Sequence, residues 1–134
     1  MHTYQHEVKY YECDRMGITH HSNYVRFMEE ARVDYLDKMG YGFDKIEAEG
    51  VFSPVVSIEC SYKSPTTFKD VIDIEVGIGK VSEMKFEFNY TMRVGGKLVC
   101  VGKSTHCFTE NGRPVAISRR LPGLFEKIQA AQTQ

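Results

Sequence analysis

The stretch that decides the fold is residues 12–32, which read ECDRMGITHHSNYVRFMEEAR. Its first half follows neither helical nor strand periodicity and contains Gly17, so we predict a loop. Its second half opens an amphipathic helix. The apolar stripe of this helix consists of Tyr24, Phe27, Met28, Ala31, Tyr35 and Met39. We expect the side chain of Ser22 or Asn23 to cap the helix, and Gly40 to follow its end.

Most of the remaining sequence alternates between apolar and polar residues, which is the period of a half-buried strand. The predicted strands are residues 4–10, 56–63, 72–79, 84–94 and 97–109. Gly95-Gly96 and Asn111-Gly112 are turn signals. Short helices are expected over 44–49 and 121–131. This order of one strand, a long helix and consecutive antiparallel strands predicts an α+β fold in which a curved sheet packs one face on the helix.

Bulk composition limits the classes of function. The 134 residues suffice for one domain with its own core, so we expect a single domain over 1–134. A net charge of −1 with scattered basic residues argues against a nucleic-acid partner. No apolar run approaches the roughly 20 residues that stable membrane insertion needs. The absence of a signal-peptide pattern and of any Cys-x-x-Cys pair predicts reduced thiols and a cytoplasmic location. The uncovered edges of such a sheet predict an oligomer.

The loop between the first strand and the long helix concentrates the candidate chemistry. The first turn of a helix offers free N–H groups and the positive end of its dipole, which together stabilise a developing oxyanion. Asp14 stands close by in sequence and is suited to attack a carbonyl carbon or to activate water. Gly17 lets the backbone approach closely. From the residues alone, Asp14 is equally interpretable as an ordinary turn residue.

Residues 13–24, running into 27–32, resemble the signature of the hot-dog-fold thioesterases. The resemblance is to the 4-hydroxybenzoyl-CoA thioesterase branch, and rests on an Asp, a Gly three residues later, and an Asn-Tyr pair that opens the helix. It extends over about the whole chain. It implies a curved antiparallel sheet wrapped around one central helix and the hydrolysis of acyl-CoA to free acid and CoA. It also implies no metal or organic cofactor, and a homo-oligomer that is a dimer or tetramer.

The resemblance also implies roles for individual residues. Asp14 corresponds to the catalytic carboxylate, acting as nucleophile or general base. His21 corresponds to the position whose backbone N–H polarises the thioester carbonyl, so its imidazole only shapes the pocket. Gly17, Asn23 and Tyr24 correspond to substrate-binding positions at the helix entrance. The acyl group, the choice between CoA and an acyl-carrier protein, and the choice between covalent and general-base chemistry stay open.

Several residues invite other interpretations. A metal site at His20-His21 lacks a third ligand at useful spacing. A nucleophilic Cys13 is disfavoured because the neighbouring Asp14 opposes the thiolate. Glu30 and Arg32 are expected on a solvated or interface face of the helix, with a role in orienting loop groups as the alternative. Candidates for contacts to the CoA phosphates are Lys63, Arg93, Arg113, Arg119 and Arg120.

Two other functions fit the same fold. One is a hydratase or dehydratase of acyl thioesters, which needs a histidine and an acid that act together at C3 of the acyl chain, and no matching pair stands out in the sequence. The other is a non-catalytic protein that binds acyl-CoA or an acyl carrier.

Overall fold

The chain folds around a five-stranded antiparallel sheet, and the computed structural model describes residues 2–132. The strand order is β1-β4-β5-β6-β3. The bounds of these strands are β1 (His2–Glu7), β3 (Val55–Tyr62), β4 (Val71–Val81), β5 (Phe86–Val94) and β6 (Lys97–His106). A small second sheet consists of β2 (Val51–Phe52), β7 (Phe108–Glu110) and β8 (Arg113–Val115). The helices are η1 (Tyr10–Glu12), α1 (Asn23–Lys38), α2 (Phe43–Ala48), α3 (Ile117–Arg120) and α4 (Pro122–Ala131).

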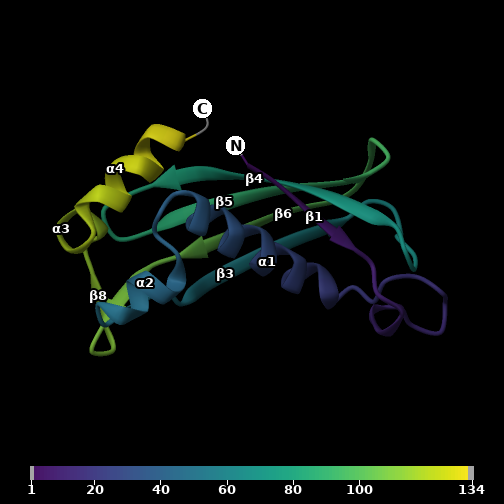
Figure 1. The fold of residues 1–134 in the computed structure, drawn as a ribbon, viewed down its shortest axis with the longest axis horizontal. Helices are drawn as coiled ribbons and strands as arrows, with labels where there is room; N and C mark the ends of the chain where they lie inside the picture. The colour runs from purple at the N-terminus through teal and green to yellow at the C-terminus, as the bar shows by residue number, and fades with distance from the viewer. Residues whose placement is uncertain (1, 133–134) are drawn as a thin grey trace.

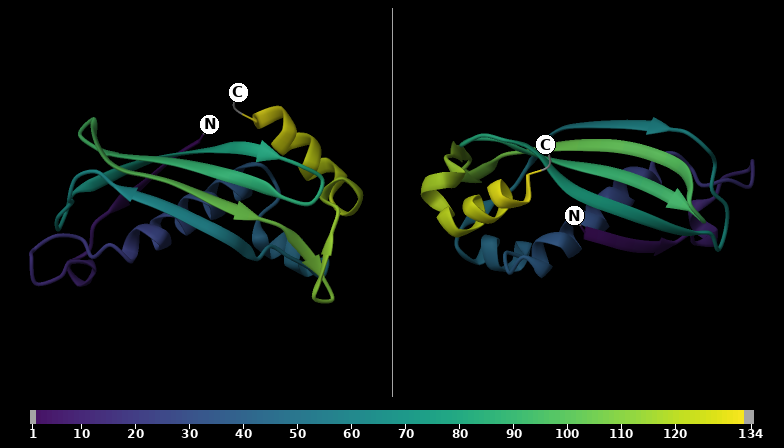
Figure 2. Two further views of the ribbon diagram at one scale, coloured as in Figure 1. Left: turned by 180° about the vertical axis from the view of Figure 1, so that it is seen from behind. Right: turned by 90° about the horizontal axis from the view of Figure 1, so that it is seen from above.

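Helix α1 lies along one face of the sheet, and none of the helices within residues 2–132 covers the opposite face (Figures 1 and 2). The predicted stripe on α1 is buried, apart from the partly exposed Met39. The side chains that form the facing wall are Ile72, Ile74, Val76, Ile78, Phe86, Phe88, Tyr90 and Met92. Each large apolar side chain of this kind contributes about 1.5–3 kcal/mol when it leaves water. The alternation in the strands and the helical stripe therefore meet in one core, as the sequence predicts.

The entrance of α1 differs from the prediction. The helix begins at Asn23, but neither expected side chain caps it. Ser22 Oγ lies 2.8 Å from Nδ1 of His20, and Asn23 Nδ2 donates to the carbonyl oxygen of Glu12 at 2.9 Å. The capping prediction is wrong because both side chains bond back into the preceding loop. No side chain among residues 2–132 caps the first turn of α1, although the Ser22 N–H just before it donates to His20 Nδ1 at 3.3 Å.

The strand predicted over 97–109 is in fact two strands in two sheets. β6 ends at His106, and β7 starts at Phe108 and pairs with β2. Burial alternates through Cys107 without interruption, with Ser104, His106 and Phe108 all buried, so a period of two alone does not reveal the change of sheet. The first strand was predicted to run to residue 10, but Tyr10 lies in η1 and is 79% exposed. The turn predictions are confirmed, since Gly95 and Gly96 have φ of 55° and 84°.

A buried polar cluster crosses the core beneath α1. Tyr90 Oη lies 2.7 Å from Ser104 Oγ, which lies 2.7 Å from His106 Nε2. Burial lowers the pKa of His106 to about 3, so the imidazole is neutral. Arg32 is only 4% exposed, and the prediction that it lies on a solvated face is wrong. Arg32 follows the buried Ala31 on the inner side of α1. Its positive charge acts to lower the pKa of both Tyr90 and His106.

Candidate active site

The loop from 8 to 22 connects β1 to α1 and projects at the end of the molecule opposite α3 and α4 (Figure 1). It is a folded unit, because Cys13 and Thr19 form an isolated antiparallel bridge. Within the bridge, the Asp14 N–H donates to the Ile18 carbonyl at 2.9 Å, and the Gly17 N–H donates to the Asp14 carbonyl at 3.0 Å. Gly17 has φ of +78°, which glycine adopts without strain. Asp14 thus occupies the first position of a tight turn.

The Asp14 carboxylate is held by one oxygen only. Its Oδ1 accepts the N–H of Met16 at 2.8 Å. Within residues 2–132, Oδ2 has no hydrogen-bond partner and no Lys, Arg or His forms an ion pair with the group. Asp14 is therefore a turn residue, as one interpretation of the sequence has it, and also a carboxylate with one oxygen open to a ligand.

The backbone of His21 is held on one side and open on the other. Its carbonyl accepts the N–H of Tyr24 at 3.2 Å and the hydroxyl of Tyr62 at 3.3 Å. Its own N–H has no acceptor among residues 2–132. Because this N–H lies at the amino end of the 16-residue helix α1, it adds to the positive potential of the helix dipole.

Asp14, His21 and Tyr24 line one cavity of about 510 Å³, a volume suited to a small-molecule ligand. The rest of its wall consists of Met16, Ile18, Thr19, Tyr62, Lys63, Ser64 and Pro65. Tyr24 Oη lies 2.9 Å from Thr66 Oγ1, and burial raises the pKa of Tyr24, so its hydroxyl stays neutral. The cavity wall is mainly apolar, and its polar groups include the Asp14 carboxylate, the helix entrance at His21 and Lys63.

Gly17 and Asn23 do not line this cavity. Gly17 lines a neighbouring cavity of about 400 Å³ on the other side of the loop, together with Tyr10 and Phe68. Asn23 turns its side chain toward Glu12. The structure therefore assigns Gly17 to the turn and Asn23 to loop anchoring, and their roles in substrate binding stay predictions.

Tyr62 and Lys63 were missed as cavity residues by the sequence analysis. They stand at the end of β3, about 40 residues after the loop, and only the pairing of β3 with β6 brings them to it. Tyr62 follows Ile58 and Cys60 on the alternating apolar face of its strand, so it was recognisable as inward-facing. Nothing in the sequence indicated that Tyr62 would lie next to the entrance of α1.

Only one of the five basic residues considered for CoA phosphates lines the cavity, and it is Lys63. Arg93 pairs with Glu75 at 3.1 Å. Arg120 pairs with Glu110 at 3.2 Å. The remaining two, Arg113 and Arg119, belong to β8 and α3 at the opposite end of the molecule (Figure 1).

Other features of the described residues bear on the predicted classes of site. Residues 2–132 contain no group of three His, Cys, Asp or Glu side chains placed to hold a metal ion. The four cysteines are free thiols, although the sulfurs of Cys60 and Cys100 lie 3.5 Å apart on neighbouring strands. No helix in the described part of the chain has the length and apolarity that a membrane crossing requires.

Comparison with known proteins places the chain in a family. Residues 8–131 match the model of the thioesterase-like superfamily. The chain belongs to this superfamily. In Bacillus subtilis, the protein named "Putative acyl-CoA thioesterase YneP" is 31% identical over 129 residues, which cover 94% of each chain. A 1,4-dihydroxy-2-naphthoyl-CoA hydrolase of Prochlorococcus marinus is 24% identical, over 90% of this chain and 83% of that protein.

Solved structures agree with this placement. The DHNA-CoA thioesterase of Staphylococcus aureus superposes with a TM-score of 0.90 at 26% identity, over 96% of this chain and 90% of that one. A hypothetical protein of Aquifex aeolicus superposes with a TM-score of 0.89 at 30% identity, over 93% and 99%. The predicted hot-dog fold is confirmed, and so is the predicted class of enzyme, a thioester hydrolase.

Proposed function

We propose that residues 1–134 act as one hot-dog domain that hydrolyses acyl-CoA, with Asp14 as the catalytic carboxylate and the His21 N–H as the donor to the thioester carbonyl. One observation carries this proposal. The carboxylate of Asp14, the backbone of His21 and the ring of Tyr24 line the same cavity, and within residues 2–132 neither Asp14 Oδ2 nor the His21 N–H has a hydrogen-bond partner.

Binding places the thioester between the loop and the helix entrance. The carbonyl oxygen accepts the N–H of His21, which becomes more favourable as negative charge develops on that oxygen. The acyl group occupies the apolar part of the cavity beside Tyr24 and Tyr62. The hydroxyl of Tyr62 supports the carbonyl of His21 and so fixes the direction of the donor.

Two routes to products are consistent with this arrangement. In the covalent route, Asp14 Oδ2 attacks the carbonyl carbon, the C–S bond breaks, the thiolate of CoA leaves, and water hydrolyses the resulting mixed anhydride. In the general-base route, Asp14 takes a proton from water, whose oxygen attacks the same carbon, and the proton passes to the departing thiolate. Both routes give one carboxylic acid and one CoA thiol for each water consumed.

The named relatives support CoA as the carrier, since the B. subtilis and P. marinus proteins are both named for acyl-CoA substrates. Lys63, at the rim of the cavity and without an ion-pair partner in residues 2–132, is the residue we propose for a CoA phosphate. The cavity wall accepts either an aromatic or an aliphatic acyl group, because its large residues are Tyr, Ile, Met and Pro.

We further propose that the protein is a homo-oligomer, a dimer or a tetramer, with β3 at an interface. β3 is an edge strand, and its backbone donors and acceptors on the outer side are available for pairing. Val55 and Val56 on this strand are 43% and 47% exposed and would be covered by such an interface. Sedimentation velocity would measure the state, and a monomer at micromolar concentration would contradict this part of the proposal.

The decisive experiment measures thiol release from a panel of aromatic, short-chain and long-chain acyl-CoAs by wild type and by Asp14→Asn. We expect turnover of at least one substrate by wild type and a loss of about a thousandfold in kcat for the variant. Near-normal turnover by Asp14→Asn would overturn the role of Asp14. Tight binding without thiol release would support a binding protein, and hydration of an enoyl-CoA without thiol release would support a hydratase.

A single turnover in ¹⁸O-labelled water tests for the covalent route through label in the protein, because label in the released acid alone fits both routes. In the covalent route, hydrolysis of the anhydride at the acyl carbon puts the label in the released acid, whereas attack at the Asp14 side puts it in the protein. Mass spectrometry of the peptide that contains Asp14 detects the second outcome. Trapping of an acyl-enzyme by hydroxylamine would support the covalent route over general-base chemistry.

A further inference from the structure

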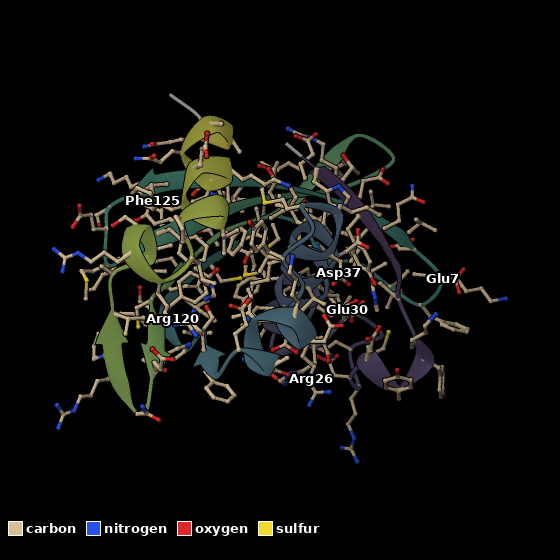
Figure 3. The ribbon with its side chains drawn as sticks, turned by 60° about the vertical axis from the view of Figure 1, so that its left-hand side comes forward. Glu7, Arg26, Glu30, Asp37, Arg120 and Phe125 are labelled. Atoms are coloured by element: carbon tan, nitrogen blue, oxygen red, sulfur yellow. The ribbon has the colours of Figure 1, made fainter. Side chains whose placement is uncertain are left out.

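His6, next to the last residue of β1, lies between two carboxylates and is only 8% exposed. Its Nε2 is 2.8 Å from Glu12 Oε1, and its Nδ1 is 3.0 Å from Glu30 Oε1. Glu30 also accepts the hydroxyl of Tyr4 at 2.8 Å. Figure 3 shows Glu30 on α1, at the side where that helix meets β1. Three elements, β1, η1 and α1, thus meet at one imidazole.

Both ring nitrogens of His6 are engaged. Nε2 contacts the carboxylate of Glu12 and Nδ1 contacts that of Glu30, so the ring links the loop to α1. The ring also packs against Phe27, with centroids 4.1 Å apart, so the protein fixes both its orientation and its position.

Glu12 transmits this contact to the loop that carries the site. Its side chain also accepts the N–H of Lys9 at 2.7 Å, so the carboxylate is held from two directions. Its backbone carbonyl accepts the N–H of His20 at 2.8 Å and Nδ2 of Asn23 at 2.9 Å. Glu12 therefore stands two residues before Asp14 and binds both sides of His21.

We infer that His6 is a positioning residue for thioester hydrolysis, which fixes the Asp14 carboxylate and the His21 N–H relative to one another by anchoring Glu12 to β1 and α1. This inference rests on the proposed function of the loop. His6 does not line the cavity and touches no substrate. Its effect reaches the reaction through geometry, and a displacement of about 1 Å between reacting groups costs roughly a hundredfold in rate.

The chain contains a matched control for this inference. His2, four residues earlier on β1, contacts Asp34 on α1 through Nε2 and Oδ2 at 2.5 Å, and stacks on Tyr35. Both histidines therefore join the same strand to the same helix through a carboxylate. Only His6 has a second carboxylate, and that carboxylate belongs to the loop.

The experiment compares His6→Gln with His2→Gln in the full chain. The glutamine amide retains one contact but does not supply a ring bonded to carboxylates on both sides. We expect His6→Gln to lower kcat for thiol release about tenfold or more with a small change in KM, and His2→Gln to keep kcat within about twofold. Hydrogen exchange followed by mass spectrometry should show faster exchange over residues 12–23 in His6→Gln only.

A double-mutant cycle tests the path through Glu12. If His6 acts by holding Glu12, then His6→Gln combined with Glu12→Gln lowers kcat no further than the more damaging single change. Multiplication of the two effects would overturn this path. Should His6→Gln not fold, Glu30→Gln supplies the same test from α1, because it removes one of the two carboxylates at a partly exposed position.

The outcomes separate this inference from the proposed function. Equal kcat values for wild type, His6→Gln and His2→Gln, with activity lost in Asp14→Asn, would overturn the positioning role and leave the proposed function intact. Activity retained in Asp14→Asn would overturn the proposed function. Equal losses of thermal stability in both histidine variants, with unchanged kcat, would show that His6 only joins β1 to α1.

Discussion

Two carboxylates stand two residues apart in the loop before α1, and the protein treats them in opposite ways. Glu12 is 5% exposed, and its Oε1 receives the Lys9 N–H and contacts His6. Asp14 is partly exposed, has one backbone donor on Oδ1 and has no partner on Oδ2 within residues 2–132. A buried carboxylate held by both a side chain and a backbone N–H is suited to hold structure, whereas a partly exposed one held by a single backbone donor remains able to react. The comparison teaches that the buried group fixes the frame in which the more exposed one is presented.

The largest expected effect separates activity from stability at Asp14. Asp14→Asn should lower kcat about a thousandfold, equivalent to about 4 kcal/mol of transition-state stabilisation. Its free energy of unfolding should stay within about 0.5 kcal/mol of wild type, because the amide oxygen still accepts the Met16 N–H. Urea denaturation measures the second quantity, and a large loss of stability would show that Asp14 is a structural residue like Glu12.

The reverse result is expected for Glu12. Glu12→Ala removes the hydrogen-bond partner of the buried His6 ring and the acceptor for the Lys9 N–H. We expect a loss of about 3 kcal/mol in the free energy of unfolding, since each buried polar group left unpaired costs roughly 1–3 kcal/mol. Urea denaturation against Glu7→Ala, an exposed carboxylate on the same segment, provides the comparison. A cost below about 1 kcal/mol would mean that Glu12 is no better anchored than a surface carboxylate.

A smaller effect tests whether Lys63, on the wall of the same cavity as Asp14, contributes to the binding of acyl-CoA. Lys63→Ala should raise KM for acyl-CoA about threefold or more and leave kcat nearly unchanged, because a phosphate contact distant from the thioester stabilises ground and transition states alike. The matched control is Lys97→Ala, a lysine at the exposed start of β6. Equal KM values for the two variants would remove Lys63 from the CoA site.

The smallest effect concerns a third carboxylate, Asp34, whose histidine partner is nearer the surface. The hydrogen bond from His2 lowers the pKa of Asp34, so the ionised form stabilises the fold above the unfolded-state pKa, and this contribution is lost as pH falls through the lower folded-state pKa. Asp34→Asn should cost less than about 1 kcal/mol at neutral pH and nothing in strong acid. Unfolding measured between these limits tests the sign, and a cost that grows in acid would contradict it.

Much of the fold was predictable because its signals are local. The apolar stripe on α1 and the alternation in β4 and β5 indicate which side of each element is buried. Gly95-Gly96 indicates the positive φ angles of the turn between β5 and β6. The predicted helix cap was wrong because the side chains of Ser22 and Asn23 form hydrogen bonds with the preceding loop. Capping preferences describe only bonds to the first turn of the helix and do not include these partners. The break at Cys107 was missed because both sheets require the same alternation.

The residues of the candidate site can likewise be divided into those that the sequence indicated and those that it left open. Asp14, Gly17 and His21 lie within eight residues, so one loop and one helix entrance suffice to bring them close, and the resemblance in this stretch named them. The position of Glu30 was left open between a solvated face and a role in orienting loop groups, and its contact with His6 agrees with the second.

The sequence by itself determined the elements, the local turn at Asp14 and the family to which the chain belongs. Only the tertiary structure decided that Tyr62 and Lys63 complete the cavity, that Arg32 is buried, and that His6 joins Glu12 to Glu30. The physical reason is the distance along the sequence between the residues that interact. Periodicity and turn chemistry depend on neighbours a few residues away, whereas these contacts join segments whose meeting depends on strand register and on the packing of α1 across the sheet.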